Sequence, residues 1–131
     1  MKLEYLDDID GGGQYPDAWP TKLIRLFDFD EQQNRQLIEL LSGKLLSQQV
    51  AVELADIQFI HALNCRLLLR LSVIDKGISE LSKPNSFACD LTKRSYLAAI
   101  ANMRNVGDGY NWLGDVSEKG IEFLYSAGGT W

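Results

Sequence analysis

Apolar and polar residues alternate along five stretches of the chain, and this spacing places successive side chains on opposite faces of a β-strand. The predicted strands are residues 21–28, 49–54, 65–74, 86–91 and 121–126. In the longest of them, every second residue from Cys65 to Val73 is apolar, whereas Arg66 and Arg70 lie on the opposite face. One dry face and one partly wet face are typical of a largely antiparallel sheet.

Two other stretches carry apolar residues at steps of three and four, the spacing of an amphipathic helix. The first begins after Asp30, whose side chain is predicted to form a capping box with Gln33, and it ends near Gly43 or one turn later. The second begins after Thr92, a predicted N-cap, and ends near Arg104. Because strands and helices do not alternate regularly, their order does not require a parallel sheet.

These elements predict an α+β fold in which a mostly antiparallel five-stranded sheet has two helices packed on one face. At 131 residues, the chain is expected to form a single domain over 1–131. Residues 1–20 contain a triple glycine and two prolines. Their apolar residues follow neither the alternation of a strand nor the three- and four-residue steps of a helix, so they predict an irregular N-terminal arm. The glycine-rich residues 105–120 predict a long loop with a short extended piece.

Charge narrows the classes of partner. The chain carries 18 acidic and 13 basic side chains, a net charge of −5 at pH 7. That sign opposes binding to a phosphate backbone, and the adjacent Lys93 and Arg94 have acids close by, so we expect no nucleic-acid partner. An acidic domain does favour basic proteins, which leaves open a role as the neutralising partner of a basic toxin or regulator.

The sequence predicts neither a targeting signal nor a membrane span. The first ten residues lack an apolar run, and the most apolar stretch, residues 63–74, is interrupted by Arg66 and Arg70. Cys65 and Cys89 belong to no CxxC motif, so free buried thiols are expected. We therefore expect a cytoplasmic protein that does not bind a membrane.

No metal or cofactor is expected. The glycine run at 11–13 follows no strand and precedes no helix, as a phosphate-binding loop would require. The acidic run before it does not fit a calcium loop, because Leu6 occupies the first ligand position and Asp17 the last. A solvated acidic segment is the preferred interpretation.

Four residues are candidates for catalysis: His61, Cys65, Asp108 and Asp115. His61 is the only histidine and would be a general base for the Cys65 thiol, but residues four apart need not meet in a connection that enters a strand. Asp108 and Asp115 lie in the glycine-rich region, where acids can converge on a substrate. A turn histidine, a core thiol and loop aspartates are the favoured structural interpretations.

Aromatic residues concentrate near the C-terminus. They are Tyr110, Trp112, Phe123, Tyr125 and Trp131. They predict either a cleft that stacks against a ligand or a secondary core that fixes the loop. The core is favoured, because large rings without converging polar groups usually pack together.

Three apolar residues, Leu68, Ile74 and Leu124, interrupt polar positions on the predicted outer face of the sheet. If they form one exposed patch, it would bind a protein partner or a second copy of the chain. The leading hypothesis is therefore a non-enzymatic protein-interaction module, with Leu68, Leu124 and the aromatic residues Tyr110, Trp112 and Trp131 as candidate binding residues. The alternative is a small hydrolase or ligand-binding enzyme that uses loop carboxylates beside an aromatic cleft.

Four segments of the sequence carry a resemblance: KLIRLFDFD, SFACDLT, YNWLGD and IEFLYSAGGTW. They resemble segments of small uncharacterised bacterial proteins over most of the chain. The resemblance implies a shared fold, and it brings no activity, cofactor or catalytic residue.

Overall fold

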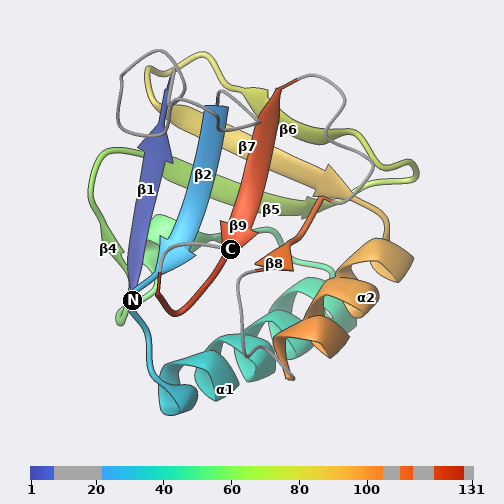
Figure 1. Ribbon diagram of the computed structural model, residues 1–131. Helices are drawn as coiled ribbons and strands as arrows, with labels where there is room; N and C mark the ends of the chain where they lie inside the picture. Colours follow the sequence, from blue (N-terminus) through green and yellow to red (C-terminus); the bar gives the residue numbers. More distant parts are fainter. Residues whose placement is uncertain (8–21, 105–109, 114–119, 129–131) are drawn as a thin grey trace.

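Strands of two sheets and two α-helices surround a shared apolar core (Figure 1). This computed structural model describes residues 1–7, 22–104, 110–113 and 120–128. Strands β1, β2 and β9 lie in front of β5 and β7, and both helices lie together at the lower end of the molecule in this view (Figure 1).

The larger sheet has the strand order β4-β1-β2-β9-β8. Its strands are β1 Lys2–Leu6, β2 Lys22–Phe27, β4 His61–Ala62, β8 Tyr110–Asn111 and β9 Ile121–Tyr125. The β1·β2 and β8·β9 pairs are antiparallel, whereas β2·β9 and β1·β4 are parallel. The sheet is therefore mixed.

The smaller sheet has the order β3-β5-β7-β6. Its strands are β3 Val52–Glu53, β5 Arg66–Leu71, β6 Gly77–Glu80 and β7 Ser86–Leu91. The central pair β5·β7 is parallel, and the two edge strands β3 and β6 pair antiparallel with their neighbours. Arg70 and Asp90 face each other across β5·β7, and the guanidinium binds both carboxylate oxygens at 2.7 and 2.8 Å.

The helices begin where the sequence predicts. Helix α1, Glu31–Leu40, starts with the predicted capping box, in which Asp30 Oδ1 accepts from the Gln33 amide at 2.8 Å and Gln33 Oε1 accepts from the Asp30 amide at 3.2 Å. It continues as a π-helical segment, Leu41–Ser47. Helix α2, Lys93–Met103, is capped by Thr92, as predicted.

The α+β class with two helices is confirmed, but the prediction of a single, mostly antiparallel five-stranded sheet is matched only in part. The described strands form one sheet of five strands and one of four, and each contains at least one parallel pair. The alternation of apolar and polar residues shows which face of the sheet a side chain occupies. It does not show which strand pairs with the strand that carries it. The interior strands β7 and β9 are also buried on both faces, including Asp90 and Glu122, so they carry little of the polar face that the prediction assumed.

Individual elements also differ from the prediction. The N-terminal arm is not irregular at its start, because Lys2–Leu6 forms β1 and Leu3 is fully buried. The run 49–54 yields only the two-residue β3, after which Leu54–Asp56 form a 3₁₀ turn. Strand β6 was not expected, since Gly77–Glu80 contains a single large apolar residue. The rest of the arm, residues 8–20, lies outside the described residues.

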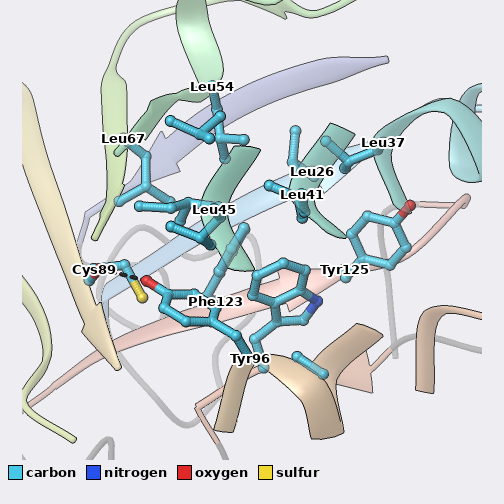
Figure 2. Close-up of a cluster of buried hydrophobic side chains, with 14 of the residues drawn as sticks. Leu26, Leu37, Leu41, Leu45, Leu54, Leu67, Cys89, Tyr96, Phe123 and Tyr125 are labelled. Carbon is cyan, nitrogen blue, oxygen red and sulfur yellow. Dashed lines mark hydrogen bonds between the residues drawn. The ribbon is translucent and has the colours of Figure 1, made fainter. Parts of the chain in front are cut away.

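The core collects side chains from both sheets and both helices (Figure 2). Leu37, Leu41 and Leu45 follow one face of α1 and the π-helical segment, and they point toward Leu26 and Phe123 of the larger sheet and Leu67 of the smaller one. The spacing of four residues keeps the three leucines on one helix face. The opposite helix face is left for other contacts, which include the groove described next.

Candidate functional site

A groove of about 850 Å³ lies between the end of α1 with its π-helical segment and the edge strand β3. Gln36, Leu40 and Lys44 form the helical wall, because steps of four residues lie on one face. The opposite wall consists of residues 50–53 and the 3₁₀ turn that follows. A groove of this volume is large enough to hold several side chains of a bound peptide.

The two walls face each other because the chain reverses sharply after the helix. Gln49 takes a left-handed conformation with φ 56°, and the Val50 amide donates to the Lys44 carbonyl at 2.9 Å. A left-handed residue after a helix is the common way to end it, although glycine is the usual choice. Gln49 is a non-glycine residue in that conformation, and its two chain neighbours, Gln48 and Val50, line the groove.

Three carboxylates line the groove: Glu39, Glu53 and Asp56. Arg66 on β5 holds two of them, with Nη2 at 2.6 Å from Asp56 Oδ1 and Nε at 3.3 Å from Glu53 Oε1. These contacts, first of all the hydrogen bond to Asp56, raise the pKa of the guanidinium, which stays charged. Arg66 and Lys44 together offset two of the three negative charges, so the groove keeps a net negative charge.

One carboxylate oxygen of a residue that lines the groove lacks a donor. Glu53 Oε2 is buried and has no hydrogen-bond partner within the described part of the chain. Buried polar atoms are normally satisfied by protein or by water, and leaving one unsatisfied costs about 1–3 kcal/mol. The position therefore favours a group that brings an N–H donor.

Apolar side chains give the groove a second kind of surface. Val50 is 50% exposed, and Leu40, Phe59 and Leu68 are half-buried along its walls. Leu68 is one of the predicted binding residues, and the structure places it in this groove.

The predicted patch of Leu68, Ile74 and Leu124 is not formed. Leu124 is only 1% exposed and packs with Leu23 in the larger sheet, whereas Leu68 belongs to the smaller sheet. Ile74 is exposed in the turn after β5. The prediction assumed a single sheet, and two sheets place the residues on separate surfaces.

The surroundings of His61 and Cys65 do not fit a nucleophile and its base. His61 is exposed on β4, where its backbone amide bonds the Met1 carbonyl at 2.8 Å. Cys65 is buried, and burial, with smaller contributions from Glu53 and Glu4, raises the pKa of its thiol to about 12. Burial likewise raises the pKa of Cys89 to about 12. Both thiols are free, as predicted, and both are protonated at neutral pH.

The aromatic residues that the structure describes pack as core. Trp112 is buried with its ring centroid 4.9 Å from that of Phe123 and 6.1 Å from that of Tyr125. The Tyr110 hydroxyl accepts from Asn102 Nδ2 at 2.7 Å nearer the surface. Trp112, Phe123 and Tyr125 therefore lie in the core, and the partly buried Tyr110 packs against it. Trp131, Asp108 and Asp115 lie outside the described residues, as do the glycine run and the aspartates that follow Asp7.

Sequence reasoning missed Glu53, Asp56 and Arg66. The signal available was an acid on each side of a short turn and an arginine on the next long strand. Their convergence depends on the antiparallel register that sets Glu53 opposite Leu68, which the sequence does not specify. Among the described side chains, no group of three His, Cys, Asp or Glu residues is arranged to hold a metal ion.

Comparison of the chain with protein-family models, with curated proteins and with solved structures finds no match in any of the three. Within residues 1–7, 22–104, 110–113 and 120–128, no helix has the length and apolar character needed to cross a membrane. The groove is therefore interpreted from its own chemistry.

Proposed function

We propose that the protein is a non-enzymatic protein-interaction module and that the groove beside β3 docks a partner segment carrying a lysine or arginine next to an apolar residue. The observation that carries this proposal is the buried Glu53 Oε2, which lacks a donor among the described residues and belongs to a side chain that lines the groove together with the exposed Val50 and the half-buried Leu68.

Each half of the proposed ligand has a counterpart in the groove. An ammonium or guanidinium group supplies the N–H that Glu53 Oε2 lacks, and a hydrogen bond to a charged carboxylate is stronger than one between neutral groups. An apolar side chain next to it covers Val50 and Leu68 and excludes water from that bond. Binding energy at protein interfaces concentrates in a few contacts from which water is excluded in this way.

The carboxylates are arranged for recognition. Arg66 fixes Glu53 and Asp56 through their Oε1 and Oδ1 atoms, so the free Oε2 has a defined position before a partner arrives. An acceptor that is already oriented costs less entropy on binding.

Fluorescence anisotropy with a short labelled peptide of valine, isoleucine and lysine tests the proposal. We expect saturable binding to the intact chain, and no binding of a matched peptide in which glutamate replaces lysine. Glu53→Gln keeps the side-chain shape and the acceptor toward Arg66 but removes the charge, so it should weaken binding about tenfold.

Glu31→Gln is the matched control, because Glu31 begins α1, lies outside the groove and is well exposed. It should leave the affinity unchanged. Equal effects of the two substitutions, or equal binding of the lysine and glutamate peptides, would show that the groove is not the docking site.

A further inference from the structure

A second surface complements the groove. The turn between β5 and β6 presents Val73, which is 95% exposed, and Ile74, which is 59% exposed. The segment extends past the end of β5 at the edge of the molecule (Figure 1). We call residues 72–76 the β5–β6 tip. Two adjacent β-branched residues so far from the core contribute little to the stability of the fold.

Hydrogen bonds hold the β5–β6 tip in place. The Ser72 and Lys76 amides donate to the Leu91 and Asp90 carbonyls, each at 2.9 Å. The Asp75 carboxylate accepts from the Thr92 amide and from the Ser95 hydroxyl, both at 2.8 Å. The apolar pair is thus presented on a fixed turn, which lowers the entropy lost when it binds.

Positive charge surrounds the exposed apolar pair. Lys76, Lys93 and Arg94 are all exposed, and the described residues provide none of them with an ion pair. Lys93 and Arg94 open α2, to whose N-cap region Asp75 is bonded, so they lie beside the tip. The helix N-terminus adds partial positive charge. Asp75 is the one carboxylate within the tip itself.

We propose that the β5–β6 tip of one copy of this chain docks in the groove of a second copy. The tip offers what the groove accepts: apolar side chains for Val50 and Leu68, and cations for Glu39 and the unsatisfied Glu53 Oε2. The inference rests on the proposed function and names its partner as the chain itself.

The two surfaces cannot satisfy each other within one molecule. Leu68 on the groove wall and Val73 in the tip are five residues apart along an extended strand, which separates them by about 16 Å. Contact is therefore between copies: two reciprocal tip-to-groove contacts would close a twofold dimer, whereas a single contact would leave one free tip and one free groove. The single contact, repeated from copy to copy, forms rings or open chains. A single turn in a groove buries little area, so association is weak and depends on concentration.

Light scattering coupled to size-exclusion chromatography, over a range of loading concentrations, tests the inference. The unmodified chain should give a mass that rises with concentration from that of a monomer to that of a dimer or a larger assembly. A tip variant, Val73→Asp with Ile74→Asp, and a groove variant, Glu39→Lys with Val50→Lys, should each weaken association about tenfold or more. All four positions are exposed, so the fold should be retained.

Mixing the two variants provides the decisive step. One intact groove and one intact tip remain in the mixture, so it should form a dimer and nothing larger. Leu63→Asp is the control, because Leu63 is an exposed leucine outside both surfaces, and it should behave like the unmodified chain. If a double variant fails to fold, the single changes Ile74→Asp and Glu39→Lys replace it in the same mixture.

Two results would overturn the inference: a chain that stays monomeric at every concentration, or variants that fail to form a dimer when mixed. The peptide experiment then separates the two proposals. If a monomeric chain binds the lysine peptide, the groove remains a docking site for another protein and only self-association is ruled out. If the chain neither self-associates nor binds the peptide, the proposed function is ruled out as well.

Discussion

Asn34 and Tyr125 connect α1 to β9 across the core, because the Tyr125 hydroxyl donates a hydrogen bond to Asn34 Oδ1. The amide of the same asparagine donates to the Met103 carbonyl in α2 at 2.8 Å. One buried side chain therefore fixes three elements relative to one another. Since α1 and its continuation form a wall of the groove, this connection also determines where that wall stands.

Removing the Asn34 connection should destabilise the fold. Tyr125→Phe deletes one donor and should lower the free energy of unfolding by about 1 kcal/mol. Asn34→Ala leaves the Tyr125 hydroxyl and the Met103 carbonyl buried without this partner, so it should lower the free energy of unfolding by about 2–3 kcal/mol. Urea unfolding measures both. Tyr110→Phe is the control, because its hydroxyl bonds Asn102 at an exposed position, and a loss equal to that of Tyr125→Phe would contradict the account.

Stability should fall at alkaline pH. Burial raises the folded-state pKa of Cys65 and of Cys89 from 9.0 to about 12, so the folded chain keeps protons that the unfolded chain releases. Stability from these thiols is fully present below pH 9.0 and is lost as the pH rises from 9.0 toward about 12.

Urea unfolding on both sides of pH 9.0 measures this slope. A variant with Cys65→Ala and Cys89→Ala should have a shallower slope whatever its absolute stability. Some slope will remain, because burial also raises the pKa of Tyr96 and of Tyr125. An unchanged slope in the variant would show that the thiols are not buried as described.

Gln49 is expected to limit stability. Its left-handed conformation, with φ 56°, is one that a non-glycine residue adopts at a cost of about 1 kcal/mol. Gln49→Gly should therefore raise the free energy of unfolding by up to about 1 kcal/mol, measured by urea or heat. The neighbouring Gln48→Gly is the matched control: with φ −85° it lies in the ordinary helical region, so glycine there should destabilise the chain.

Self-association should weaken as salt is added. The cations of the β5–β6 tip and the Glu39 carboxylate are exposed, so their attraction is screened when the Debye length falls from about 10 Å at 0.1 M salt to about 3 Å at 1 M. Sedimentation velocity across that range should show a shift toward monomer. Association that strengthens with salt would instead indicate a purely apolar contact.

The sequence predicts local structure well where the structure depends on residues that are close together in the chain. Asp30 and Gln33 form the capping box that their spacing predicts, and Thr92 caps α2. Strand β7 has the predicted bounds, Ser86–Leu91. These features depend on residues a few positions apart, so the sequence itself contains the necessary information.

Arrangements that depend on distant residues were not predicted. The parallel pairing of β2 with β9 joins residues about a hundred positions apart, and alternation says nothing about it. The groove also depends on strand pairing that the sequence does not specify, because Arg66 reaches Glu53 and Asp56 only when β3 pairs with β5. Leu68 was predicted as a binding residue because it interrupts the polar positions of a strand face, but the side chains that surround it could not be identified.

The claim that the groove beside β3 docks a cationic and apolar segment is tested most directly by amide chemical shifts of the ¹⁵N-labelled chain during titration with the valine, isoleucine and lysine peptide. The account predicts that the largest changes occur at Lys44, Val50 and Glu53, and that they are much reduced in Glu53→Gln. Changes that concentrate elsewhere on the molecule, or an unchanged spectrum at saturating peptide, would contradict it.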